Sequence, residues 1–189
     1  MSSDATLAPP DPDGTTFAAL VAAAVSAGTD QAAAESRRVR ALAAAGHHAI
    51  RVMAGQRASV RSAEMALREI ASEIAAAESL SDRSVQRQID DAMTLVDGFP
   101  ETVNAWQAGT LTRGHVHAIR DVGTRVPVDK RAEFDARAVA SAAGVSPGRL
   151  KTRLAMLAEQ LQPTTVSERH RVAHERRCVR LVTGTEGTS

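Results

Sequence analysis

Apolar residues recur at helical spacing along the middle of the chain. They follow one another at steps of four, three, four and three residues: Val85, Ile89, Ala92, Val96 and Phe99. This spacing predicts an α-helix with one buried face. Ser81 stands where an N-cap is expected, because its hydroxyl can accept a hydrogen bond from the first turn. Gly98 predicts the end of this helix, and Pro100 the start of the next.

Two shorter helices are predicted to follow. The first contains Val103 and Trp106, the only tryptophan in the chain, and ends at Gly109. Thr112 is placed to cap the second, which has apolar residues on one side: Val116, Ile119 and Val126. We expect Trp106 to anchor the core here.

The N-terminal part predicts three helices after a polar start. Residues 1–14 are rich in Pro, Asp and Ser and are expected to be disordered. A short helix then runs from Thr15 or Thr16 to Ala27, where Gly28 stops it. A long helix follows to about residue 54, and another from Ser62 to about residue 78.

The C-terminal part predicts further helices and one strand-like run. Asp129 is placed to cap a helix that Gly144 ends, and Ser146 with Pro147 starts another that ends before Pro163. A helix over about 165–176 and alternating apolar residues at 179–182 come next. The prediction is therefore an all-α, irregular multi-helix bundle of about seven or eight helices over residues 15–183. A short C-terminal strand and a flexible tail at 184–189 complete it.

Composition and charge narrow the class of protein. At 189 residues with 2% aromatic residues, the chain can hold one domain with an aliphatic core. The net charge is only +1, but residues 147–180 contain eight basic and three acidic residues. Cys178 is the only cysteine, so no internal disulfide is expected. The acidic N-terminus is unlike a secretion signal, and the apolar run 17–27 is too short to span a bilayer, so a cytoplasmic, non-membrane protein is predicted.

Residues 67–89 are similar to a helix-turn-helix. Arg83, Gln86 and Arg87 would face outward from its second helix and could reach base edges in a DNA major groove. The connection before Ser81 is about one helical turn too long for this motif. Two ordinary packed helices are the alternative interpretation.

The basic C-terminal residues are the other candidate DNA contacts. They could bind phosphates without reading sequence: Arg149, Lys151, Arg153, Arg169, Arg171, Arg176, Arg177 and Arg180. Alternatively, they pack against another domain or are solvated.

No catalytic or metal site is predicted. His170, His174 and Cys178 are four residues apart and would share a helix face, but a fourth zinc ligand is not apparent. His115 and His117 point to different faces of their helix, so they cannot chelate one ion. The sequence contains no glycine-rich phosphate loop and no nucleophile elbow.

The order of these motifs resembles the actinobacterial family called domain of unknown function 222, also known as the 13E12 repeat type. The matching features are Phe99-Pro100, Thr102, Ala105, Gly109, Leu111-Thr112, the helix with His115, Ser146-Pro147, Arg149-Leu150, Pro163, Arg169, Arg177 and Val179. The resemblance covers roughly residues 15–183. Members of this family usually end in an HNH endonuclease domain, which would cut DNA with a divalent metal.

The HNH motif itself is absent from this sequence, because the only asparagine, Asn104, lies in a helical pattern far from any suitable histidine pair. The chain is therefore expected to be a truncated member without catalytic residues or cofactors of its own. The resemblance implies a DNA-binding or nuclease-supporting role, with duplex DNA, a downstream nuclease domain or a second copy as partner. The alternative is a helical docking or oligomerisation module that does not bind DNA.

Overall fold

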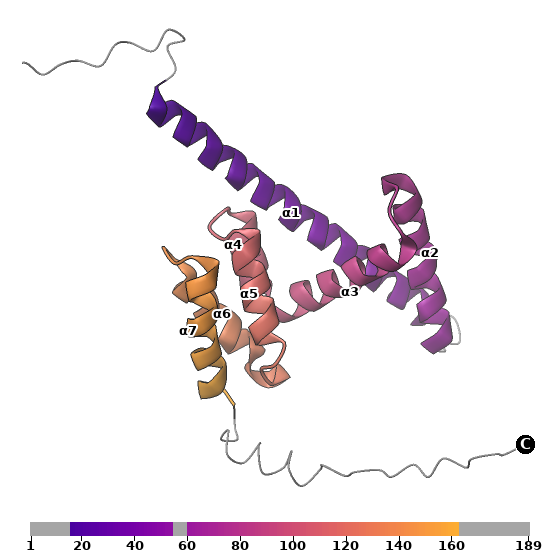
Figure 1. Ribbon diagram of the computed structural model, residues 1–189. Helices are drawn as coiled ribbons and strands as arrows, with labels where there is room; N and C mark the ends of the chain where they lie inside the picture. The colour runs from indigo at the N-terminus through magenta and orange to yellow at the C-terminus, as the bar shows by residue number, and fades with distance from the viewer. Residues whose placement is uncertain (1–15, 55–59, 163–189) are drawn as a thin grey trace, which may run out of the picture.

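The computed structural model describes residues 16–54 and 60–162 and is all-α over that range (Figure 1). The elements are α1 (Phe17–Ala54), α2 (Val60–Glu78), α3 (Asp82–Gly98), α4 (Pro100–Gln107), α5 (Arg113–Gly123), the 3₁₀ turn η1 (Val128–Lys130), α6 (Arg131–Ala142) and α7 (Pro147–Gln160). This confirms the predicted fold class. The terminal segments 1–14 and 184–189, the helix at 165–176 and the strand at 179–182 lie outside the described residues.

The prediction that Gly28 ends the first helix is wrong. A single helix of 38 residues passes through Gly28 without interruption. A glycine inside a helix costs about 1 kcal/mol relative to alanine, and the many neighbouring alanines are the best helix formers. The Thr29 hydroxyl donates to the Val25 carbonyl four residues earlier, at 3.2 Å, so this side chain bonds within the continuous helix.

The other helix boundaries in the middle of the chain follow the predicted signals. The Ser81 hydroxyl accepts a hydrogen bond from the Ser84 amide at 3.3 Å and caps α3. Thr112 and His115 form a reciprocal cap at the start of α5. Gly109 has a φ of +73°, a conformation that favours glycine, in the turn between α4 and α5.

Two details near α6 differ from the prediction. Asp129 lies within the 3₁₀ turn η1, and the N-cap of α6 is Lys130. Val126 is buried as expected, but it follows the end of α5 at Gly123. The chain turns between α5 and α6, and this turn contains both Val126, which apolar spacing had assigned to a helix, and Asp129, which was predicted as an N-cap.

The core has two parts joined by α1 and α3. The first lies between the C-terminal half of α1, α2 and α3, and consists of Leu42, Ala43, Ala71, Ala75, Val85, Ile89 and Ala92. The second lies among α4 to α7 and contains the aromatic residues Phe99, Trp106 and Phe134. Val39 and Val96 contact both parts. The predicted anchoring role of Trp106 is confirmed, and the abundant alanine lets helices approach closely.

A buried carboxylate closes the N-terminus of α4. The N-cap residue, Phe99, has no side-chain acceptor, so the first amides of α4 need one from elsewhere. Asp135 of α6 supplies it, accepting from the Glu101 amide at 2.8 Å and the Thr102 hydroxyl at 2.5 Å. Burial raises the pKa of Asp135, while these hydrogen bonds act to lower it. The contact fixes α6 against α4.

Gly123 provides a test of the second core. A Cβ placed there would meet the rings of Phe99 and Phe134, lying 2.7 Å from Cε1 of Phe134. These rings already pack edge to face with centroids 6.5 Å apart. Gly123→Ala should therefore lower the free energy of unfolding by about 1–3 kcal/mol through overpacking, as measured by urea denaturation.

Gly148→Ala is the matched control, because Gly148 lies in α7 with no atom within 4 Å of an added Cβ. It should leave stability unchanged or raise it by up to about 1 kcal/mol. Equal midpoints for the two variants would contradict this description of the core.

Candidate docking surface

The start of α1 has no other described helix packed against it. Every residue from 16 to 31 is exposed, and this segment extends beyond the other helices (Figure 1). Phe17, Leu20, Val21 and Val25 are 82%, 58%, 45% and 65% exposed. Their spacing places them on one face of the helix. A contiguous apolar face of this kind marks an interaction site more often than scattered exposed residues do.

The same face becomes buried further along the helix. The stripe continues at helical spacing through Ala32, Val39, Leu42 and Ala43, where α3 and its neighbours cover it. The bundle therefore covers only the C-terminal part of one continuous stripe. The sequence analysis missed this feature because it divided the helix at Gly28. The helical spacing of Phe17, Leu20, Val21 and Val25 was the signal that could have revealed it.

A groove lies where the exposed stripe meets the bundle. It is formed by α1, α3 and α5, with Trp106 of α4, and has a volume of about 440 Å³. Its apolar lining consists of Val39, Leu42, Ala92, Leu95, Trp106 and Val116. The other lining residues are polar or charged: Glu35, Arg38, Gln88, Asp91, Arg113, His117 and Arg120.

Three ion pairs surround this apolar lining. Arg113 lies 3.5 Å from Glu35, and Arg120 lies 3.0 Å from Asp91. Arg38, the third arginine, pairs with Glu78 of α2 at 2.5 Å. Each arginine of the groove therefore already pairs with a carboxylate, so the arginines give the groove no unpaired positive charge with which to bind an anion. These exposed pairs contribute little stability individually, but they set the shape of the groove.

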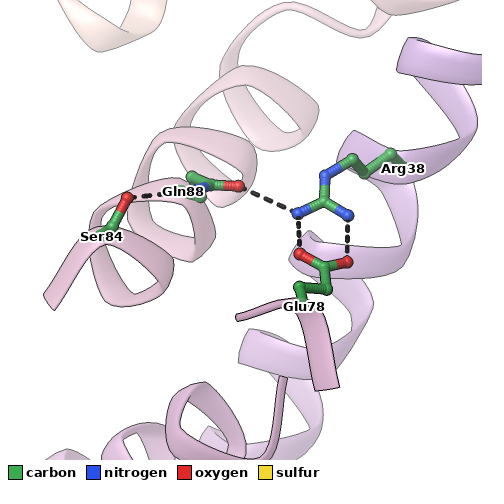
Figure 2. A network of polar contacts seen from close by, with 4 residues as sticks. All are labelled: Arg38, Glu78, Ser84 and Gln88. Atoms are coloured by element: carbon green, nitrogen blue, oxygen red, sulfur yellow. Dashed lines mark hydrogen bonds and ion pairs between the residues drawn. The ribbon is translucent and has the colours of Figure 1, made fainter. Parts of the chain in front are cut away.

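The Arg38 pair joins three helices (Figure 2). Both terminal nitrogens of Arg38 on α1 bond to the Glu78 carboxylate at the end of α2. One of them also donates to Gln88 of α3 at 3.1 Å, and Gln88 donates to Ser84 at 3.4 Å. The hydrogen bonds with Arg38 lower the pKa of Glu78. This network fixes one end of the groove.

Trp106, one of the residues that line the groove, has a buried donor without a partner. The residue is only 4% exposed, and its indole nitrogen is one of two buried side-chain nitrogens without a hydrogen-bond partner in the described part of the chain. A buried indole N–H usually finds an acceptor.

The predicted DNA contacts lie on separate helices. Arg149, Lys151 and Arg153 are exposed on α7, and the two arginines are one turn apart on the same side. Arg83 and Arg87 are likewise exposed on one side of α3. The exposed residues of α3 also include four acids: Asp82, Asp90, Asp91 and Asp97. These carboxylates would repel phosphates, which weakens the prediction of DNA contact for α3 more than the prediction for α7.

The remaining predicted residues are Arg169, Arg171, Arg176 and Arg177, and they lie outside the described residues, as does Arg180. The suggested zinc ligands His170, His174 and Cys178 lie there too. Among the residues that the structure describes, no group of three or more His, Cys, Asp and Glu side chains could hold a metal ion.

His115 has a structural role in α5. Its Nδ1 accepts from the Thr112 amide at 3.2 Å, and its Nε2 lies 2.6 Å from the Val145 carbonyl oxygen. This histidine is therefore fully engaged in capping α5 and in holding the segment before α7.

The sequence analysis judged the apolar run 17–27 too short to span a bilayer, but in the structure this run is part of the longer helix α1. Residues Phe17–Arg51 form a helix that is long and apolar enough to cross a membrane by length and composition alone. This is weak support for a membrane span, because core helices and signal sequences pass the same test. The C-terminal half of the helix is part of the protein core, which favours a surface role for the exposed half.

The structure is that of a helical protein in which the start of α1, residues 17–31, has an exposed apolar face. We call this segment the arm. The family model of the Domain of unknown function (DUF222) matches residues 18–189, so the chain belongs to this family, as its motif order indicated. No curated protein and no solved structure matches the chain.

The Arg38–Glu78 pair predicts a pH dependence. The pKa of Glu78 is lower in the folded than in the unfolded protein, so the unfolded state binds more protons between the two values. The stabilisation is present above the unfolded pKa and is lost as the pH falls through the folded pKa. Glu78→Gln should therefore melt below wild type at pH 7, and the difference should shrink under acidic conditions.

Glu133→Gln is the control for this pH series. Glu133 pairs with Arg137 within a single helix, at 3.4 Å, and joins no other element. It should change the melting temperature less than Glu78→Gln at every pH. A constant difference between Glu78→Gln and wild type from pH 7 to pH 3 would refute the role of this pair.

Proposed function

We propose that this protein is a helical docking module that self-associates through the exposed stripe of α1. The observation that supports this proposal is the stripe itself. Four large apolar side chains lie on one face of α1, and no described element covers them. The family is one of unknown function, so the proposal rests on the geometry of the exposed stripe. It favours the docking interpretation of the sequence over a DNA-binding role as the primary one.

The chemistry of the arm favours a second copy as the partner. Residues 17–29 contain no charged side chain, so two such segments can meet without repulsion. The chain's own C-terminal segment, residues 163–189, contains five arginines and three glutamates and is a poor match for this surface. An uncharged stripe against its own copy leaves no buried charge unpaired.

The energetics allow pairing through the stripe if most of it is covered. A dimer brings together four side chains from each copy, and fully burying these eight would contribute at most about 12–24 kcal/mol. Association costs about 4–15 kcal/mol in lost freedom and side-chain ordering. The four side chains are 45–82% exposed in the single copy, so the gain is below this upper limit. The extent of burial therefore decides how stable the dimer is.

The oligomeric state tests this function. Val21→Asp with Val25→Asp should abolish self-association, because two charges would be buried at the interface. Both positions are exposed, so the helical content and melting temperature of the dilute protein should not fall. Sedimentation velocity over a hundredfold range of concentration is the measurement.

Met156→Asp is the control for the paired substitution, since Met156 is 58% exposed on α7, away from α1. It should associate like wild type. A wild-type protein that stays monomeric at the highest concentration would refute the proposed function.

DNA contact through α7 is the second candidate function. Arg149 and Arg153 form an exposed basic edge, which supports non-specific phosphate contact and a nuclease-supporting role. If about three to five phosphates are neutralised, log affinity should fall against log salt with a slope of roughly −3 to −4. Arg149→Ala with Arg153→Ala should weaken binding to two unrelated duplexes equally, as measured by fluorescence anisotropy.

Arg83→Ala with Arg87→Ala distinguishes the two DNA interpretations. It should leave binding nearly unchanged if α7 makes the contact, and should alter sequence preference if α3 enters the major groove. Absence of binding at low salt by folded protein would rule out both.

A further inference from the structure

We infer that two copies pair in antiparallel fashion over residues 17–28 of α1 alone, with the crossing point between Ala22 and Ala23, so that Phe17 of each copy packs against Gly28 of the other. The inference rests on the proposed self-association and specifies which positions meet. The covered part of α1 and the groove take no part in this pairing.

The bundle sets the limit of the free stripe. Ala32 is only 6% exposed, whereas every residue from 16 to 31 is exposed. The turn between α4 and α5 marks the edge of the bundle, because a Cβ added at Gly109 would overlap the Thr29 side chain. A partner can therefore lie along the stripe only from Phe17, where the helix begins, to Gly28.

The same limit selects the direction of the partner. In a parallel pair, both helices would run together from residue 17 towards residue 54, and each would enter the space that the bundle of the other occupies. In an antiparallel pair, each helix instead continues past the start of the other, where no other described helix lies (Figure 1). The two bundles then lie at opposite ends of the paired arms.

The sizes of the side chains along the stripe fit this register. Pairing about the midpoint of residues 17–28 places large side chains of one copy opposite smaller ones of the other: Phe17 and Gly28, Leu20 and Val25, Val21 and Ala24. The largest side chain of the stripe thus meets the position that has none. Helix faces interdigitate best when large and small side chains alternate across the contact in this way.

Gly28 supplies the space for the Phe17 ring of the second copy. A Cβ built at Gly28 meets no atom within 4 Å, so packing within one copy does not require a glycine here. Its φ is not positive either, so the backbone does not require one. Glycine is also a poor residue for the interior of a helix. Contact with a large side chain of a second copy gives this glycine a role that the single copy does not.

The overlap buries no charge. Residues 17–28 contain no charged side chain, and Asp30, the first charged residue of the helix, lies outside the overlap. The paired segment spans about 18 Å of helix. Such a short interface gives a weak pair whose population depends on the protein concentration.

A lipid surface is a less suitable occupant of the stripe. Helices that lie on membranes usually have lysine or arginine on their polar face, whereas residues 1–36 contain no basic residue. A lipid partner is therefore treated as an outcome of the test.

Disulfide formation between copies tests the direction and the register. In a Cys178→Ser background, a mixture of Phe17→Cys and Gly28→Cys proteins should form the mixed disulfide in a glutathione buffer, because these positions meet. Neither variant should link to itself, since the two residues 17, like the two residues 28, lie about 16 Å apart along the pair. The mixed dimer also retains one unaltered contact between Phe17 and Gly28.

Ser26→Cys is the control for the cross-linking, because residue 26 lies on the opposite face of the helix. It should not link to Phe17→Cys. Self-linked products that equal or exceed the mixed product would indicate parallel or non-specific pairing and overturn the inference.

Exchanging the large and the small side chain gives a second test. Gly28→Leu should raise the melting temperature of the dilute protein, because leucine is the better helix former. It should nevertheless weaken self-association by about tenfold to a hundredfold, since the added side chain would overlap the Phe17 ring of the other copy. Phe17→Ala should also weaken association, by lost apolar contact. The two changes together should restore it, because a large side chain again meets a small one.

Ala19→Leu is the control for this exchange, because Ala19 is exposed on the opposite face of α1. It should associate like wild type in sedimentation velocity. Stronger association of Gly28→Leu, as expected if the stripe were only a larger apolar surface without a register, would contradict the inference.

The outcomes separate the inference from the function on which it rests. A dimer that forms without the 17–28 disulfide and is not weakened by Gly28→Leu would overturn the inference and leave the proposed function standing. A protein that is monomeric at all concentrations would overturn both. If the protein binds neutral phosphatidylcholine vesicles through the stripe and does not form the disulfide in solution, the occupant is lipid and the inference fails.

Discussion

The structure depends on the continuity of α1. Its 38 residues span about 57 Å, which is longer than the bundle that packs on it. The two parts of the core meet on this helix and on α3, so α1 holds the α2–α3 unit and the α4–α7 unit together. The apolar stripe of α1 continues beyond the end of the bundle. The N-terminal part of the stripe must therefore either stay exposed to solvent or be covered by another molecule. The proposed docking function follows from that constraint.

The parts of the fold that could be predicted from sequence depend on local signals. Ser81, Thr112 and Pro147 define helix starts through groups within four residues of themselves, so their spacing can be recognised without knowledge of the fold. The passage of α1 through Gly28 could not be recognised in the same way. It reflects a small energetic cost at one glycine that a long row of alanines outweighs.

The contacts that shape the site are long-range and could not be predicted in this way. Asp135 caps α4 from 33 and 34 residues away, and the groove exists only where four separate helices meet. Three arginines lie close together in the sequence at residues 37, 38 and 40. Arg38 bonds to Glu78, and Arg40 donates to Asn104 at 2.7 Å, so two of the three connect α1 to neighbouring helices. A basic run in sequence therefore does not by itself define a contact surface for nucleic acid.

The exposed arm also links folding to association. An isolated helix of about 15 residues is only marginally stable in water, because starting a helix is costly while extending one is not. The N-terminal half of α1 avoids the cost of initiation by extending a half that is already packed against α3. It gains little further stability from contacts of its own, since its residues are exposed. Covering the stripe would then both bury apolar surface and hold the arm helical. The free arm is therefore the least stable part of the helix, and the part that gains most from a partner.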